Sequence, residues 1–158
     1  MHKLCLLLGC SSTVWKDAAM AQGMFPDAAV CAVNDIGGYW PWRLDYWVTR
    51  HPEILSPLQE LRKHRYFNTD YESCVKTSGF GGGSGAEAIV YLLPRAETIL
   101  LCGMPLDDTP RFTSSPFVPD IDHARYREGF EQVADQYNLK GRVFSISGWT
   151  RDFFGCNF

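Results

Sequence analysis

Long apolar runs are missing from this 158-residue sequence. The apolar run near its start, KLCLLL, ends at Gly9 after a few residues. That run is too short for the core of a signal peptide and far too short to cross a bilayer. We therefore expect no membrane span and no targeting signal, and a cytoplasmic location.

Basic charge is also scarce. The formal net charge is −3, whereas proteins that wrap duplex nucleic acid usually carry a basic patch. The one basic cluster, residues 62–65 (RKHR), falls at the end of a predicted helix, where cations are favourable against the helix dipole. We interpret it as a solvated helix end. The charge pattern argues against bulk nucleic acid as a partner and leaves room for a small anionic ligand.

Paired cysteines are absent as well. The sequence has six cysteines but no CxxC pair, so it does not indicate a zinc site or a disulfide framework. Cys5, Cys31 and Cys102 lie within apolar runs, where cysteine usually acts as a small buried hydrophobe. This pattern favours reduced thiols in a cytosolic protein.

Apolar content is ample: 46% of the residues are hydrophobic and 14% are aromatic, which excludes a disordered chain. Short apolar segments alternate with helical patterns, as in a parallel sheet that is buried on both faces. We predict the α/β class: a single Rossmann-like domain, residues 1–158, in three layers with a mainly parallel sheet. The predicted strands are 4–8, 28–33, 46–49, 66–68, 98–102 and 143–146. The predicted helices are 14–22, 53–64 (interrupted or restarted near 56–57), 84–93 and 122–137.

Polar residues follow the predicted strands, and ligands of open α/β sheets bind beyond the carboxyl ends of the strands. After the first strand come Gly9, Ser11 and Ser12, which lead into a helix. Their hydroxyls can either cap that helix or contact a phosphate at its positive N-terminus. Both interpretations stay open. The GxGxxG fingerprint of dinucleotide-binding folds is absent.

The next two strands end in further candidate ligand contacts. Asn34 and Asp35 follow the second strand, where the asparagine can bind a base or ribose edge or close an Asx-turn. Arg50 and His51 follow the third strand. Arginine suits bidentate recognition of phosphate or carboxylate, so this pair is a candidate contact to a phosphate or an acceptor. An ordinary surface position explains Arg50 equally well.

The glycine-rich segment 77–85 is the most informative part of the sequence. It begins with Thr77, Ser78 and Gly79, and Ser84 followed by Glu87 matches a capping box that predicts a helix start. Its glycines allow backbone amides to approach an anion near the helix N-terminus. A flexible loop is the alternative. The segment is not a Walker loop, because no Gly-Lys-Ser/Thr follows.

An irregular stretch, residues 103–121, precedes the longest predicted helix. Loops of this length in compact domains are more often functional than idle. His123 lies just beyond it and is a candidate general base, with a structural or solvated histidine as the alternative. Asp107 and Asp108 can hold a divalent metal or form an exposed acidic turn. We favour the turn.

An aromatic stretch, Tyr39-Trp40-Pro41-Trp42, follows the second predicted strand. Aromatic residues of this kind are enriched at protein interfaces, but they also form ordinary core or pocket walls. We favour the pocket wall here.

These segments in this order resemble the bacterial sialyltransferases that decorate lipooligosaccharide, and the related Rossmann-like family of archaeal hydroxymethylpterin pyrophosphokinases. The sequence also closely resembles small proteins encoded in bacteriophage genomes. It covers nearly the whole chain: the motifs are LLLGCSS, Asn34 in CAVND, the Thr-Ser-Gly at 77–79, LLCGMPLD, His123 and FSISGWTRDFFG. The chain departs from the family at Cys10 and Ser11, where Asn and Pro are usual, and at Pro105, which replaces an Asp.

The resemblance implies a glycosyltransferase that uses a nucleotide-sugar, of cytidine monophosphate type, with His123 as general base. The pterin branch implies instead a phosphotransferase that uses ATP and magnesium, with Asp107 and Asp108 as the nearby acidic pair. A third alternative is a nucleotide-binding phage protein without catalytic activity, in the host cytoplasm. Under each of them the partner is a small nucleotide ligand, and a homo-oligomer is compatible with the sequence.

Overall fold

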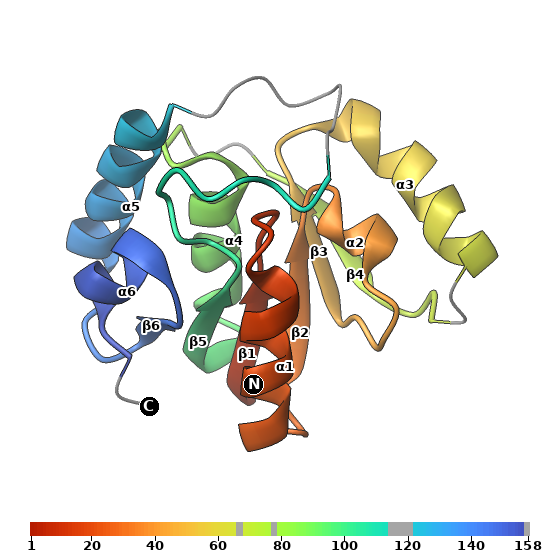
Figure 1. The fold of residues 1–158 in the computed structure, drawn as a ribbon, viewed down its shortest axis with the longest axis horizontal. Coiled ribbons are helices and arrows are strands. Elements are labelled where there is room, and N and C mark those ends of the chain that lie inside the picture. The colour runs from red at the N-terminus through yellow and green to blue at the C-terminus, as the bar shows by residue number, and fades with distance from the viewer. Residues whose placement is uncertain (66–67, 77–78, 114–121, 157–158) are drawn as a thin grey trace.

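The described part of the chain folds into six strands and six helices (Figure 1). The computed structural model describes residues 1–65, 68–76, 79–113 and 122–156. The strands are β1 (His2–Leu8), β2 (Ala29–Val33), β3 (Tyr46–Thr49), β4 (Glu72–Val75), β5 (Ala96–Cys102) and β6 (Val143–Ser145). The helices are α1 (Val14–Met24), α2 (Ile36–Tyr39), α3 (Pro52–Arg65), α4 (Gly83–Leu92), α5 (His123–Tyr137) and α6 (Gly148–Phe154). All strand pairs are parallel, so the predicted α/β, Rossmann-like fold is confirmed.

The strand order, β4-β3-β2-β1-β5-β6, places the first strand inside the sheet. The chain builds outward from β1 to β4 and then crosses back to β5 on the other side of β1. This reversal makes β1 and β5 neighbours, with Leu8 opposite Cys102 at their carboxyl ends. Ligands of open α/β sheets bind at such a switch point. The segments that follow β1 and β5 therefore frame the candidate site.

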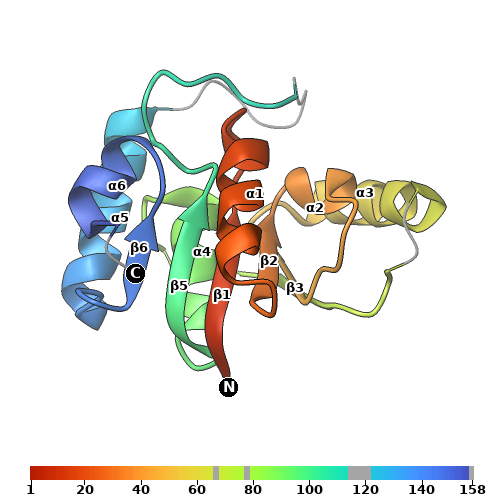
Figure 2. The same ribbon diagram turned by 60° about the horizontal axis from the view of Figure 1, so that its bottom comes forward.

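Two hydrophobic cores separate the sheet from its helices. On one face, Val14 of α1 and Ile36 of α2 are fully buried, and α3 packs against the same core. On the other face, Ile89 of α4 and Phe130 of α5 are buried against the sheet. Figure 2 shows α1 in front of the sheet and α4 behind it. The resulting three layers are those expected for strands that are buried on both faces.

Nine of the predicted elements coincide with observed ones to within two residues at each end. Pro57 lies inside α3 without ending it, so the predicted interruption near 56–57 is wrong. The strand expected at 66–68 is wrong where it can be judged, because the edge strand β4 runs from Glu72 to Val75 and residues 66 and 67 lie outside the described residues. β4 is largely exposed and lacks the apolar run that marks the central strands.

Helix α2 was not predicted, because its sequence, IGGY, contains two poor helix formers. Tertiary contacts explain the glycines. A Cβ atom on Gly37 would lie 2.1 Å from the Trp47 ring, and one on Gly38 would lie 2.9 Å from Leu58. The helix thus depends on close packing against β3 and α3 rather than on local propensity.

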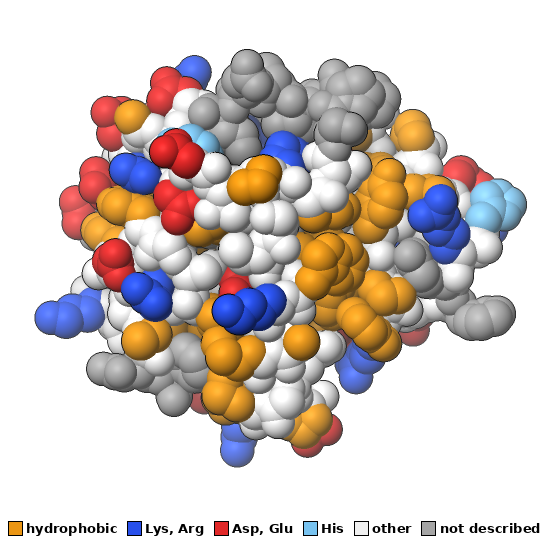
Figure 3. All heavy atoms as spheres, viewed as in Figure 1, with side chains coloured by type: hydrophobic (Ala, Val, Ile, Leu, Met, Phe, Trp, Pro, Cys, Tyr) orange, Lys and Arg blue, Asp and Glu red, His pale blue; other side chains and the backbone are white. Residues whose placement is uncertain are grey.

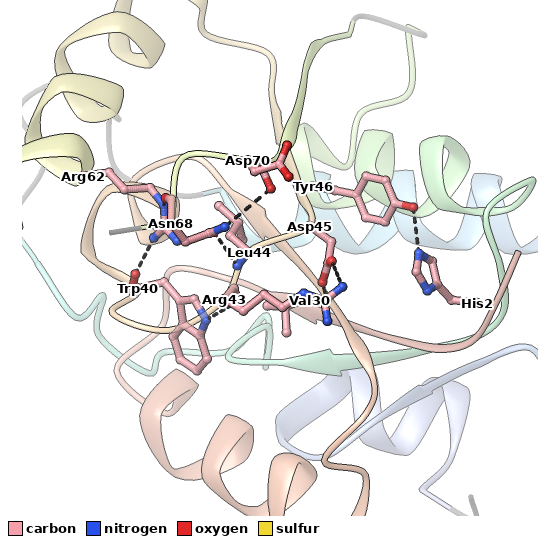
Figure 4. Close-up of polar contacts among 10 residues, drawn as sticks. All are labelled: His2, Val30, Trp40, Arg43, Leu44, Asp45, Tyr46, Arg62, Asn68 and Asp70. Carbon is pink, nitrogen blue, oxygen red and sulfur yellow. Dashed lines mark hydrogen bonds and ion pairs between the residues drawn. The ribbon is translucent and has the colours of Figure 1, made fainter. Parts of the chain in front are cut away.

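The basic residues 62–65 do not all form a solvated helix end, so that prediction is wrong for Arg62. Its side chain is 0% exposed, and it donates hydrogen bonds to the backbone oxygens of Trp40, Trp42 (2.9 Å) and Asn68 (3.0 Å). Figure 4 shows it reaching from α3 toward Trp40 and Asn68. A guanidinium can satisfy several carbonyl oxygens at once, which makes its burial tolerable. The three residues that follow it are exposed, as expected.

All six cysteines are free thiols, in agreement with the sequence. Within the described ranges, no helix has both the length and the apolar character needed to cross a membrane.

Candidate functional site

A pocket of about 100 Å³ opens at the carboxyl ends of β1, β2 and β5, beside the switch point. Four segments form its walls: the turn after β1, the end of β2, the start of α4 and the loop after β5, with α5 closing one side. Its lining residues are Gly9, Cys10, Ser11, Val33, Asn34, Gly82, Ser84, Gly85, Gly103, Met104, Pro105, Leu106, Asp107, Thr109, Arg111, His123, Tyr126 and Phe130. The fold thus brings together candidates that lie far apart in the sequence.

The turn after β1 is covered by the chain itself. The amide of Ser11 donates to the carbonyl of Gly103 (3.1 Å), and that of Ser12 donates to the carbonyl of Pro110 (2.8 Å). Residues 103–113, teal in Figure 1, pass over this turn and the start of α1. The Ser11 and Ser12 amides are therefore already engaged, and a phosphate that binds these two amides would have to displace the 103–113 segment. Ser11 lines the pocket, whereas Ser12 does not.

Close backbone approach explains Gly9. A Cβ atom there would lie 2.3 Å from the carbonyl oxygen of Gly103, and the Gly9 amide donates to the carbonyl of Cys102 (2.8 Å). Any larger residue would push the β1 and β5 loops apart. Gly9 therefore shapes the floor of the pocket by being small.

Asn34 and Asp35 follow the same strand but have different surroundings. Asn34 lines the pocket with a left-handed backbone (φ 49°), and its Oδ1 accepts from the Thr49 hydroxyl at 2.8 Å. Asp35 is 3% exposed and is absent from the lining. Its Oδ2 accepts from the Arg111 guanidinium at 2.8 Å. The direct ligand contact expected of Asp35 has no support in this geometry, because its carboxylate faces another side chain.

Arg111 is a pocket residue that the sequence did not single out. It lies in the 103–113 segment, where its backbone forms an isolated antiparallel bridge with Ser11. Its Nε atom is buried and has no hydrogen-bond partner among the described residues. The sequence marked this loop as functional by its length alone. An arginine in a loop rich in proline, serine and aspartate carries no spacing pattern that could have identified it.

The glycine-rich segment contributes through its end rather than its beginning. Gly82, Ser84 and Gly85 line the pocket, Gly79 does not, and Thr77 and Ser78 lie outside the described residues. The predicted capping box is wrong. Helix α4 begins at Gly83 after an N-cap at Gly82 and has no side-chain cap, and the Ser84 hydroxyl accepts instead from the backbone amide of Arg50 at 3.0 Å.

Arg50 supports the site from outside the pocket, and neither Arg50 nor His51 lines it. The Arg50 guanidinium donates to the carbonyl of Phe80 (3.1 Å), and its Nε lies 4.0 Å from the buried Glu87 carboxylate. His51 lies 3.2 Å from Glu53 through Nδ1, on the exposed side of α3. Arg50 therefore holds the glycine-rich segment and α4 in place against β3.

His123 is the first residue of α5 and lines the pocket. The Nδ1 atom is buried and makes no hydrogen bond within the part of the chain that is described. A buried polar atom without a partner costs about 1–3 kcal/mol, a cost that a bound ligand could remove. Among the candidates from the sequence, His123 has the geometry best suited to chemistry.

The acidic pair does not converge on a metal position. Asp107 lines the pocket, and its Oδ1 accepts from the amide (3.0 Å) and the hydroxyl of Thr109. Asp108 is exposed and does not line the pocket. Among the described residues, no group of three or more potential metal ligands gathers at one point. This arrangement fits the exposed acidic turn better than a metal site.

Cys10 is a cysteine that lines the pocket. Its Sγ donates to the carbonyl of Val33 at 3.3 Å. Burial raises the pKa of the Cys10 thiol to about 11, although the positive charge of Arg111 opposes the rise. The side chain is therefore a neutral thiol at pH 7 and is a poor nucleophile.

The aromatic stretch after β2 packs away from the pocket, so its interpretation as a pocket wall is wrong. Trp40 is 1% exposed, stacks on Trp15 (ring centroids 5.8 Å apart) and meets Trp42 edge-on (4.8 Å). Trp42 is 56% exposed. Figure 3 shows apolar side chains gathered on this face, over α1 and α2. These rings extend the core under α1 and leave part of it exposed.

The pocket joins five of the ten candidates from the sequence that lie within the described residues. The predicted residues that line it are Gly9, Ser11, Asn34, Ser84 and His123. The described candidates that do not line it are Ser12, Asp35, Arg50, His51 and Gly79. Comparisons of the chain with models of protein families, with curated proteins and with solved structures found no match.

Proposed function

We propose that this pocket binds a nucleotide-sugar and that the protein transfers the sugar to a hydroxyl acceptor. One observation carries the proposal: the imidazole of His123, with a buried Nδ1 that has no partner among the described residues, faces the switch-point pocket that Arg111 also lines. Ligands of this fold class bind at that edge, and a histidine there is suited to move a proton near neutral pH.

The proposed reaction needs one base. The acceptor oxygen attacks the anomeric carbon, the bond from that carbon to the phosphate oxygen breaks, and the nucleotide leaves with the electron pair. The acceptor proton moves to the unprotonated ring nitrogen of neutral His123. Arg111 stabilises the negative charge of the leaving phosphate. In this assignment His123 accepts the proton and Arg111 stabilises the leaving group.

Neutral hydrogen-bonding groups complete the pocket. Asn34 offers its side-chain amide beside the turn, and its Oδ1 is held by Thr49 at 2.8 Å. Gly82 and Gly85 line the pocket at the start of α4. The described walls enclose about 100 Å³, less than the roughly 300 Å³ at the lower end of pockets that hold a drug-sized ligand. That space has room for a phosphate group, and under the proposal the rest of the nucleotide-sugar extends beyond the described walls.

A magnesium-dependent phosphotransferase and a binding protein without turnover are the competing outcomes. The phosphotransferase needs carboxylates that converge on a metal, whereas Asp107 bonds Thr109 and Asp108 is exposed. The binding protein would use the same pocket without any need for His123. Both alternatives make measurable predictions that differ from those of the transferase.

The decisive experiment is a thermal-shift panel of nucleotides and nucleotide-sugars, with and without magnesium. A ligand at about 100 times its Kd stabilises the folded state by roughly 2.7 kcal/mol, which is a visible shift in Tm. The transferase predicts a shift with a cytidine nucleotide or CMP-sugar that does not depend on magnesium. A shift with ATP that requires magnesium supports the phosphotransferase instead, and no shift at all contradicts a nucleotide site.

Turnover then separates an enzyme from a binding protein. His123→Ala should lower the transfer rate about 10²–10⁴-fold, the usual contribution of a general base, while nucleotide affinity changes little. His64→Ala is the matched control, because His64 is an exposed histidine at the end of α3. Equal rates for His123→Ala and the wild type would contradict the assignment.

A further inference from the structure

We propose that Arg111 is the residue that binds the acidic group of the ligand, that Asp35 positions it, and that the pocket selects an oxyanion with a single negative charge. The inference rests on the pocket of the proposed function but not on the identity of the nucleotide or on turnover. A phosphodiester and a carboxylate share the required chemistry, and the experiment below distinguishes them.

The first step concerns the usual anion site of this fold. In Rossmann-like domains the amides at the start of the first helix often bind phosphate. Here the amides of Ser11 and Ser12 donate to the carbonyls of Gly103 and Pro110. The segment that occupies them also carries Arg111 into the pocket. Two amides in the turn before α1 are therefore not available to an anion, and the segment that engages them supplies a guanidinium instead.

The second step concerns how Arg111 is held. Its side chain is 20% exposed, and that of Asp35 is 5% exposed. Asp35 accepts at 2.8 Å from one terminal nitrogen, which restrains the position of the guanidinium. Nε is buried and has no partner among the described residues, and Asp35 engages only one terminal nitrogen of a group with five N–H donors, so donor capacity remains on the guanidinium. A planar fork of donors that is held in this way suits a carboxylate or phosphate.

The third step is the charge of the site. Arg111 contributes one positive charge, and Asp35 and Asp107 contribute one negative charge each. Asp35 lies behind the guanidinium, whereas Asp107 is part of the pocket wall. Like charges repel more strongly in a partly buried site than in water. A singly charged group can satisfy Arg111, but a pyrophosphate brings additional charge toward Asp107.

The test is a titration of the whole protein with dimethyl phosphate, acetate and pyrophosphate, in which NMR chemical shifts report binding. Arg111→Gln should weaken binding of the preferred monoanion about tenfold or more, because it removes a charge-assisted contact. Arg111→Lys keeps the positive charge but loses the forked pair of donors. Its affinity for the monoanion should lie between those of the wild type and Arg111→Gln. Arg151→Gln is the control, because Arg151 is an exposed arginine on α6 that pairs with Asp152. It should bind as the wild type does.

Asp35→Asn tests the positioning role. It should weaken the monoanion less than Arg111→Gln does and should narrow the preference of the site between planar acetate and tetrahedral dimethyl phosphate. Asp107→Asn tests charge selection. It should raise the affinity for pyrophosphate about tenfold and leave that for dimethyl phosphate within about twofold.

Binding of dimethyl phosphate alone identifies a phosphodiester ligand, and binding of acetate alone identifies a carboxylate. Binding that persists in Arg111→Gln, or no saturable binding of either monoanion, would overturn the inference. Equal affinity of the wild type for pyrophosphate and for the monoanion would overturn the charge selection. If a monoanion binds through Arg111 while the nucleotide panel shows no shift, the proposed function fails and this inference stands. If nucleotides bind to Arg111→Gln as tightly as to the wild type, this inference fails and the proposed nucleotide site stands.

Discussion

The carboxylate of Asp17 and the hydroxyl of Ser147 lie 2.6 Å apart, although 130 positions separate them in the chain. The same Asp17 oxygen accepts from the backbone amide of Gly103 at 2.9 Å. Asp17 is 3% exposed and lies in the first turn of α1. It therefore ties α1 to the turn before α6 and to the loop after β5, where its partner Gly103 lines the pocket.

Replacement of Asp17 should test the strength of this tie. Asp17→Ala leaves the Gly103 amide and the Ser147 hydroxyl without their acceptor, so we expect the free energy of unfolding to fall by about 3 kcal/mol. Urea denaturation measures the change. Asp27→Ala, at an exposed position in the next loop, should stay within about 0.5 kcal/mol of the wild type. If Asp17→Ala lost no more stability than Asp27→Ala, the hydrogen bonds of Asp17 would contribute little.

The crossing of α4 and α5 depends on a glycine. A Cβ atom on Gly129 would lie 1.8 Å from the backbone nitrogen of Gly82, so Gly129→Ala forces the helices apart and should cost about 3 kcal/mol or more. Gly23→Ala meets nothing within 4 Å near the end of α1 and should stabilise the protein by up to about 1 kcal/mol. Thermal unfolding of the pair should give shifts in Tm of opposite sign. Shifts of the same sign would contradict this packing.

The edge strand β4 provides a pH-dependent contact. The Tyr91 hydroxyl donates to the Glu72 carboxylate, and with Arg95 at 3.1 Å it holds the pKa of Glu72 below its ordinary value of 4.5. Because the folded-state pKa is lowered, this contribution is present above pH 4.5 and is lost as the pH falls through the folded-state value.

Glu72→Gln should therefore lose less stability than the wild type between about pH 6 and pH 3. The difference should stay below about 1 kcal/mol, since the Glu72 side chain is 55% exposed and water screens the pair. Denaturation midpoints across this pH range measure it. Parallel curves for the two proteins would show that the pKa of Glu72 is not lowered.

The raised pKa of Cys10 should govern its alkylation. With a pKa of about 11, the thiolate fraction rises about tenfold per pH unit throughout the range from about pH 7 to pH 9.5. Peptide mapping after iodoacetamide treatment measures the rate. At pH 8, the exposed Cys156 should react much faster than Cys10. A rate at Cys10 that levels off below pH 9 would contradict the raised pKa.

Much of the fold was predictable because its central strands are buried on both faces. The segments that became β1, β2 and β5 are apolar runs that need no alternation, and the long helix α5 begins after a side-chain cap at Asp122. The edge strand β4 and the short helix α2 were missed. One is exposed, and the other is stabilised by the Trp47 and Leu58 side chains that its glycines admit.

The sequence by itself determined the class of the fold, and with it the edge of the sheet at which Gly9, Asn34 and His123 meet. Local patterns suffice for that, since hydrophobic periodicity sets the elements and parallel strands align their carboxyl ends. Only the tertiary structure decided which side chains the pocket uses. It turned Asp35 toward Arg111, engaged the amides of Ser11 and Ser12, and left donors on Arg111. Those outcomes depend on contacts between segments about 75 to 100 positions apart, which no local pattern records.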